Sequence, residues 1–344
     1  MWRHVAVSNL LCVASNASIF RISGKPFFSN MIYLRKYVPM IKIFQKYSLY
    51  WITRLLITCA GCAGAGLAMA AASDADPAAS LRAKYAELGD QLSNNQFKRP
   101  LYLDSAESSS HLKGDIYAVV DHPFATVNTA LNGPAHWCDV LILHLNTKYC
   151  RASTNGAGSL LKVSIGKKHD QPLEDAYPVE FAYAVTATTP KYFEVQLRAG
   201  TGPLGTSDYR IMLEAVSLPD NRTFLHLTYS YAYNFAGGVA MKGYLATVGS
   251  GKIGFTNTGK QPNGQPKYIG GVRGVVERNT MRYYLAIDAY LSAMAAPGSE
   301  QLEKRLQNWF ESTERYTRQL HEVDRASYLS MKRIEYRRQQ TVVQ

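Results

Sequence analysis

FLHLTYSYAYNF, residues 224–235, alternates two kinds of side chain along its length. This alternation predicts a half-buried strand of an antiparallel sheet, with His226 on the mixed face, either exposed or satisfied at the surface. Tyrosine is an unusual choice for the buried face, because each buried hydroxyl needs a hydrogen-bond partner. What these tyrosines face is therefore the question that the fold must answer. The apolar face consists of Leu225, Leu227, Tyr229, Tyr231, Tyr233 and Phe235.

The segments before this strand show the same period of two between turn-rich breaks. In each long strand one alternate set is apolar, and the other carries polar residues such as Glu194, Arg198 and Arg210. This pattern predicts an antiparallel sheet with one wet face and one covered face. A helical stripe in residues 80–92 is expected to pack on this domain. In chain order we predict a first strand at 111–121, short helices at 122–132 and 135–145, a hairpin at 147–153 and 159–168, and strands at 178–190, 191–200 and 208–218.

A long one-sided helix is predicted at residues 275–294. At about 100° per residue its apolar side chains fall within one arc, and Arg278, Arg282 and Ser292 lie opposite. We therefore expect this helix to cover the sheet and to turn its arginines away from the core. The apolar arc consists of Val276, Thr280, Tyr283, Tyr284, Ile287, Tyr290, Leu291 and Met294.

The order of strand, two short helices, curved meander and long closing helix resembles the helix-grip fold of the START-like (SRPBCC) superfamily, an α+β fold found in the polyketide cyclase and Bet v 1 groups. The resemblance is carried by GDIYAVVDHPFATVNTALNGPAHW, residues 114–137, and by the long helix. This chain departs from the family by a 35-residue insertion at 236–270 and a helical extension at 297–344. The expected organisation is an N-terminal helix and linker at 71–100, followed by the START-like domain at 101–296.

The resemblance implies an elongated apolar cavity between sheet and helix, with tyrosines facing each other across it. Such walls suit a ligand that is mostly apolar with a polar end, and the expected function is an exported binding or carrier protein for a lipid-like molecule. A solid core, with the tyrosines bonded to one another or to buried water, stays open as the alternative. The residues expected to line the cavity are Phe181, Tyr183, Phe193, Val195, Tyr209, Ile211, Leu227, Tyr229, Tyr231, Tyr233, Thr280, Tyr283, Tyr284, Ile287, Tyr290 and Leu291.

Two carboxylates, Glu277 and Asp288, lie at the rim of the apolar arc. One of them, pointing into the cavity mouth, would act as a general base in a cyclase-type enzyme. Pairing with Arg278 or Arg282 in solvent is the structural alternative. The chain has no G-x-S-x-G, H-E-x-x-H or C-x-x-C-H motif, so neither a catalytic residue nor a cofactor or metal is assigned. An envelope interaction protein with a closed core stays open as a third function.

The first seventy residues contain eight Lys and Arg and no Asp or Glu, and they end in an apolar run that closes on Ala68-Met69-Ala70. This composition predicts a secretory signal peptide cleaved after Ala70, which places the mature protein in the periplasm or outside the cell. Residues 1–39 read as an over-extended gene start before Met40. An uncleaved inner-membrane anchor and lipidation of Cys62 stay open as alternatives.

The charge of the chain is concentrated in this leader. The whole chain carries +12, but without residues 1–70 it has 30 Lys and Arg against 26 Asp and Glu, a net charge of +4. Nucleic-acid binding therefore loses its main support. The remaining excess of positive charge lies near the C-terminus. It indicates either a solvated helix end or a surface that contacts anionic lipid headgroups. The basic residues concerned are Lys332, Arg333, Arg337 and Arg338.

Two cysteines remain after the leader, Cys138 and Cys150. An even pair in an exported protein predicts a disulfide. If the first begins a short helix and the second lies on the returning strand, their α-carbons come within the roughly 4.4 to 6.8 Å that the bond needs. Two free thiols stay open as an alternative. His136 and His144 lie close by, so a zinc site is the other alternative, although the spacing fits no common zinc signature.

Overall fold

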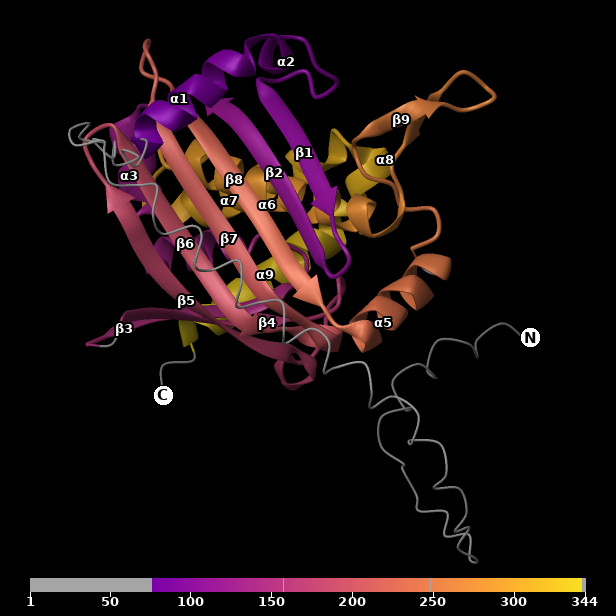
Figure 1. Cartoon of the computed structure of the whole chain (residues 1–344). Helices are drawn as coiled ribbons and strands as arrows, with labels where there is room; N and C mark the ends of the chain where they lie inside the picture. Colours follow the sequence, from indigo (N-terminus) through magenta and orange to yellow (C-terminus); the bar gives the residue numbers. More distant parts are fainter. Residues whose placement is uncertain (1–75, 157, 248, 342–344) are drawn as a thin grey trace, which may run out of the picture. The chain divides into compact units, whose positions relative to one another are not determined.

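An eight-stranded antiparallel sheet is the framework of the protein (Figure 1). The computed structural model describes residues 76–156, 158–247 and 249–341. The strand order is β1-β2-β8-β7-β6-β5-β4-β3, so the last strand of the meander closes against β2. The strands are β1 Leu101–Glu107, β2 His111–Val120, β3 Thr147–Asn155, β4 Gly158–Ile165, β5 Tyr177–Thr188, β6 Tyr192–Thr201, β7 Thr206–Ser217 and β8 Thr223–Tyr233.

The sheet begins one strand earlier than the alternation predicted. β1 pairs with β2 from Leu101 opposite Ala118 to Glu107 opposite Leu112. The prediction that residues 111–121 form the first strand is therefore wrong. β1 is a short edge strand in which Leu101 is fully buried but Leu103 only partly so, and a pattern this brief gives little signal.

The long helix α6, Gly271–Ser292, packs on the inner face of the sheet and confirms the helix-grip architecture. It contacts β2 closely at Gly114, where an added Cβ would lie 2.3 Å from the hydroxyl of Thr280. A glycine at this position is what allows the helix to approach. The short helices α3 (Phe124–Leu131) and α4 (Pro134–Leu141) were also predicted correctly.

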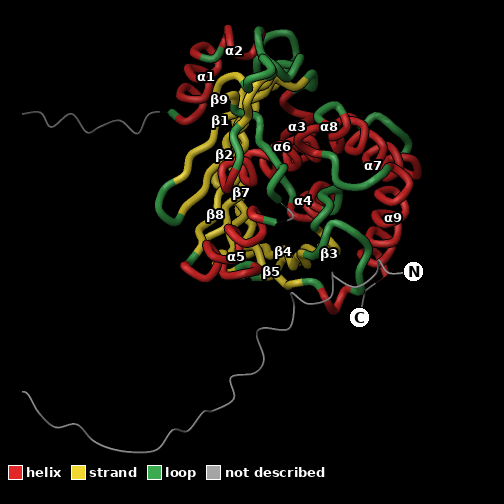
Figure 2. The backbone as a smooth tube through the Cα atoms, turned by 90° about the vertical axis from the view of Figure 1, so that its right-hand side faces the viewer, coloured by secondary structure: helices red, strands yellow, loops and turns green. Residues whose placement is uncertain are grey.

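A third layer covers α6 on the side away from the sheet, as Figure 2 shows for α7 and α9. The predicted helical extension at 297–344 is divided into α7 Gly298–Glu314, α8 Thr317–Leu320 and α9 Arg325–Thr341. The break has a local cause, because the Asp324 side chain accepts the backbone N–H of Ser327 at 2.9 Å and caps α9.

This third layer corrects the expected exposure of the arginines on α6. Arg278 and Arg282 are only 2% and 1% exposed, although the helical arc placed them on the solvent side. The Trp309 indole on α7 donates to the backbone oxygen of Arg282 at 3.2 Å, and the Arg282 guanidinium pairs with Glu322 at 2.9 Å. The sequence pattern of α6 alone could not reveal a partner that comes from another part of the chain.

The basic C-terminal cluster is also only partly at the surface. Lys332 is fully buried, where it donates to the backbone oxygens of His144 and Thr147 and to Glu335, while Arg333 pairs with Glu303 at 2.6 Å. The expectation that Lys332 contacts lipid headgroups is therefore wrong. None of the helices in the described part of the chain is both long enough and apolar enough to cross a bilayer.

The outer face of the sheet is not wet along its whole length, as the alternation had indicated. Helix α1, Pro77–Glu87, and the short α2, Gly89–Ser93, lie across one end of it (Figure 1). Leu81 and Leu88 pack there against Phe224, which is fully buried. The predicted helical stripe in residues 80–92 is confirmed as a packing surface.

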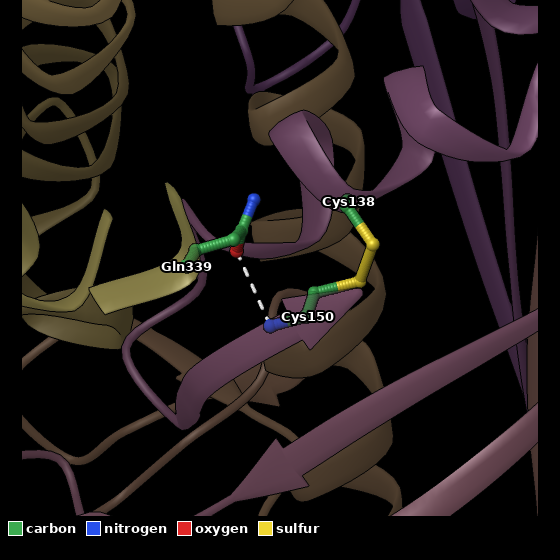
Figure 3. Close-up of a disulfide and its surroundings, with 3 residues drawn as sticks. All are labelled: Cys138, Cys150 and Gln339. Atoms are coloured by element: carbon green, nitrogen blue, oxygen red, sulfur yellow. Dashed lines mark hydrogen bonds between the residues drawn. A yellow bond between two sulfur atoms is a disulfide. The ribbon is translucent and has the colours of Figure 1, made fainter. Parts of the chain in front are cut away.

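A disulfide joins Cys138 on α4 to Cys150 on β3, as the cysteine pair predicted (Figure 3). Their α-carbons lie 5.2 Å apart. The backbone N–H of Cys150 donates to the side-chain oxygen of Gln339 at 3.2 Å, so α9 is attached beside the bond. The leader, the gene start and Cys62 lie outside the described residues.

Candidate functional site

Tyr229 and Tyr231 of β8 point into a hollow at one end of the space between the sheet and α6. The insertion contributes helix α5, Phe235–Ala246, which covers this end, and a small hairpin of β9 Asn257–Lys260 and β10 Pro266–Tyr268. Between α5, the inner sheet face and the turn after β6 lies a cavity of about 230 Å³. Its lining consists of Pro203, Leu204, Thr206, Tyr209, Tyr229, Tyr231, Gly237, Met241 and Asn279.

Three aromatic rings form the wall of this cavity and are fixed by one another. Tyr209 and Tyr231 stack with their ring centroids 5.3 Å apart, and Tyr229 packs at 5.0 Å against Tyr283 of α6. The Tyr231 hydroxyl points toward the sulfur of Met241 at 4.0 Å. Burial raises the pKa of Tyr229 and Tyr231, so both hydroxyls stay protonated. The Tyr229 hydroxyl has the Asn279 side chain as a partner, whereas the long contact of Tyr231 leaves its hydroxyl able to donate to a ligand.

Helix α5, which covers the cavity, is held to the neighbouring turn by hydrogen bonds at its first turn. The backbone N–H of Gly237 donates to the Asn234 side chain at 2.8 Å, and the backbone N–H of Asn234 donates to the oxygen of Gly205 at 3.1 Å. A Cβ on Gly237 would lie 3.0 Å from the backbone oxygens of Leu204 and Gly205. The glycine therefore lets the helix contact the turn. Leu204 in this turn is 78% exposed, so an apolar rim borders the cavity.

Most of the other residues predicted to line a cavity lie in the packed core. Tyr283 is half-buried against Tyr229, and Thr280 contacts β2 at Gly114. Tyr233 borders a separate pocket of about 330 Å³ on α5, together with Arg273. The fully packed members are Phe181, Tyr183, Phe193, Val195, Ile211, Leu227, Tyr284, Ile287, Tyr290 and Leu291.

The candidate base Glu277 is fully buried and holds the insertion against the helix. One carboxylate oxygen accepts the hydroxyls of Ser105 at 2.6 Å and Thr256 at 2.7 Å. The other accepts the backbone N–H groups of Phe255 at 2.6 Å and Thr256 at 2.9 Å. These four donors commit the carboxylate to a structural role, and nothing in its contacts favours catalysis.

The second carboxylate, Asp288, pairs with Arg99 at 3.0 Å and not with Arg278 or Arg282. Arg99 also lies over the ring of Tyr284, with 5.0 Å between its guanidinium carbon and the ring centroid. The prediction that Glu277 and Asp288 pair with Arg278 or Arg282 is therefore wrong. Arg99 comes from the segment before β1, whose position no helical periodicity could predict.

His226 lies on the outer face of the sheet but is only 7% exposed. Its ring nitrogens lie 2.7 Å from a carboxylate oxygen of Glu214 and 2.9 Å from one of Asp115. The Tyr117 ring stacks on the imidazole, with 4.0 Å between the ring centroids. Burial lowers the pKa of His226, but the two carboxylates outweigh it and raise the pKa above its usual value. The alternation placed this residue on the correct face and missed its burial.

Comparison with known proteins gives fold-level similarities alone. No family model matches the chain, and no curated protein matches it at a significant level. A truncated norcoclaurine synthase from Thalictrum flavum is 14% identical, with a TM-score of 0.30 over 42% of this chain and 89% of that chain. Ara h 8.0201 is 10% identical, with a TM-score of 0.29 over 56% of this chain and 99% of that chain.

A conserved protein from Geobacillus kaustophilus is 14% identical, with a TM-score of 0.27 over 40% of this chain and 85% of that chain. These identities and TM-scores are too low to carry an argument about what this chain does. The description of its fold rests on its own strand order and helix packing.

Proposed function

We propose that this chain is an exported START-like protein that binds an apolar small molecule with a polar end. The observation that carries the proposal is the cavity of about 230 Å³ beneath α5, whose wall is formed by Tyr209, Tyr229 and Tyr231. Aromatic rings supply apolar contact area, and the Tyr231 hydroxyl, whose contact to the Met241 sulfur is long, supplies a hydrogen bond that orients a polar end. The Tyr209 hydroxyl already donates to Thr206 at 2.8 Å.

The size of the cavity limits the ligand. A volume of about 230 Å³ is below the roughly 300–1,000 Å³ that is typical of sites for drug-sized ligands. A small aromatic or short-chain molecule fits the closed form. A lipid, which we propose as the natural class, requires α5 to swing away from the turn that contains Leu204. The glycines at 237 and 238, at the start of α5, give the backbone the conformational freedom that such a movement needs.

The proposal is tested by melting the purified protein before and after extraction with organic solvent, with mass spectrometry of the extract. We expect an apolar compound near one per chain and a lower melting temperature after extraction, because a bound ligand stabilises only the folded state. An empty extract, together with no rise in the melting temperature when medium-chain fatty acids are added, would contradict the proposal.

A further inference from the structure

A second hollow lies on the opposite side of the sheet from the tyrosines. Ser230 stands between Tyr229 and Tyr231 in β8, so its side chain points to the outer face. There a trough of about 510 Å³ crosses β2, β8, β7 and β6. Figure 1 looks onto this face, and α1 lies over its other end, away from the trough. The lining consists of His111, Leu112, Lys113, Gln196, Leu197, Arg198, Asp208, Arg210, Ile211, Met212, His226, Thr228 and Ser230.

Three cationic side chains stand in one row across this trough. The register places Arg198 opposite Arg210, Arg210 opposite Ser230, and Ser230 opposite Lys113. Like charges directly opposite each other on neighbouring strands destabilise a sheet. The arginine pair therefore has a cost in the empty protein, and a bound anion would relieve it. Ser230 is the small member of the row and leaves space between the long side chains.

Lys113 pairs with Asp115 at 2.9 Å, whereas the neighbours of the two arginines neutralise them only in part. Arg198 donates to Gln196, an uncharged amide, through two guanidinium nitrogens. Among the described residues, the contacts of Arg210 to a carboxylate are the long ones of 3.4 Å to Asp208, and its side chain is 50% exposed. A guanidinium offers a planar fork of donors that matches a carboxylate or a phosphate. Within the described part of the chain, neither the Arg198 nor the Arg210 guanidinium thus has a carboxylate at close hydrogen-bonding distance.

The backbone beside the trough departs from regular sheet geometry. The pairing of β7 with β8 shifts between Ser207 and Arg210, and Asp208 within this bulge has a φ of 47°. Non-glycine residues seldom adopt this conformation, and bulges redirect side chains next to functional sites. The irregularity lies directly before Arg210, so it sets where that side chain leaves the strand.

We propose that this trough is a binding site for a small molecule that carries a carboxylate or phosphate group, held by Arg198 and Arg210 with Lys113 across the row. The site is separate from the tyrosine cavity, because the sheet lies between them. The proposal therefore stands or fails independently of the apolar ligand.

The test is a thermal-shift titration with inorganic phosphate and, separately, with malonate, each at constant ionic strength balanced with sodium chloride. The variants are Arg198→Gln and Arg210→Gln. The matched control is Arg222→Gln, which removes the same charge from a half-buried position outside the trough with a loose contact of 4.0 Å to Asp220.

We expect at least one of the two anions to raise the melting temperature of the wild type and the control alike. Either trough variant should weaken the apparent affinity about tenfold, because each loses a charge-assisted hydrogen bond. Without added anion, both variants should melt at the same temperature as the wild type or higher, since the arginine repulsion is relieved. The anion with the larger effect identifies the chemical class of the ligand.

The proposal is overturned if neither anion changes the melting temperature of the wild type. It is also overturned if the shift is equal in the wild type and both trough variants, because that result describes general salt stabilisation.

Discussion

Lys148 on β3 and Glu335 on α9 form an ion pair of 2.9 Å although they are 187 positions apart, and both side chains are closed to solvent. Lys332 donates to the other oxygen of the same carboxylate at 2.7 Å. The C-terminal extension is thus fastened to the sheet by one buried anion between two buried cations. Burial lowers the pKa of Lys332 to about 8, and Glu335 opposes this shift in part.

Glu335→Gln should lower the free energy of unfolding by about 3 to 5 kcal/mol, because it leaves buried cations without their counter-charge. Urea unfolding followed by circular dichroism measures this loss. The control is Glu311→Gln, whose carboxylate is 62% exposed and which should change stability little. Equal effects of the two substitutions would show that the buried pair does not fasten the extension.

The stability of the protein should fall in acid through Glu322. Burial would raise the pKa of this carboxyl, but Arg282, Lys168 and Lys252 around it lower the pKa from 4.5 to about 2. A lowered folded-state pKa contributes stability above about pH 4.5, and this contribution is lost as the pH falls toward 2.

The deficit of Glu322→Gln relative to the wild type should be about 3 kcal/mol at pH 7 and less than half of that at pH 3. Chemical unfolding at the two pH values measures it. A deficit that is the same at both values would contradict the assignment of this carboxyl, and Glu300→Gln at an exposed pair is the control.

Removing the disulfide should destabilise the fold. The bond joins residues twelve apart, and closing a loop of this size stabilises by about 3 kcal/mol in the chain-entropy model. The Cys138→Ala, Cys150→Ala double variant should show a loss of this size in urea unfolding. Thiol titration of the unreduced, denatured mature protein should find no free thiol, and two reactive thiols would refute the bond.

Export should leave a mature protein that begins at Ala71. The prediction follows from the acid-free leader and its Ala68-Met69-Ala70 ending. N-terminal sequencing of protein from the cell envelope checks it. A retained segment at 40–70 would refute cleavage, whereas a lipid-modified start at Cys62 would replace the soluble form with an anchored one.

The sequence was most informative where one element decides the structure by itself. The alternation in residues 224–235 correctly predicted β8 and its tyrosine face, although β8 ends at Tyr233 and Phe235 begins α5. The even pair of cysteines correctly predicted the bond between Cys138 and Cys150. The prediction of side-chain burial failed where a residue far away in the sequence determines it. Arg282 and Lys332 look like surface residues in their own helices, and only Glu322 and Glu335 in the folded chain explain their burial.

The proposed anion-binding trough and the tyrosine cavity show the same limit. The register of β6 and β7 brings Arg198 and Arg210 together, and both were visible as members of the polar face. Their facing positions and the bulge at Asp208 depend on strand pairing, which a period of two does not fix. Likewise, Tyr209 and Tyr231 were expected at a cavity, but the helix that covers it lies in the insertion, for which the resemblance offered no guide.

Native mass spectrometry of Met241→Trp tests the apolar cavity most directly. Met241 lines the cavity from α5, so a larger ring there should fill the space beside Tyr231. Val239→Trp is the matched control, because Val239 lies on the same helix and is 55% exposed. We predict an apolar ligand bound to the wild type and to Val239→Trp but absent from Met241→Trp, with all three proteins folded. Equal occupancy in the three proteins, or a wild type that neither carries nor takes up an apolar molecule, would contradict the account.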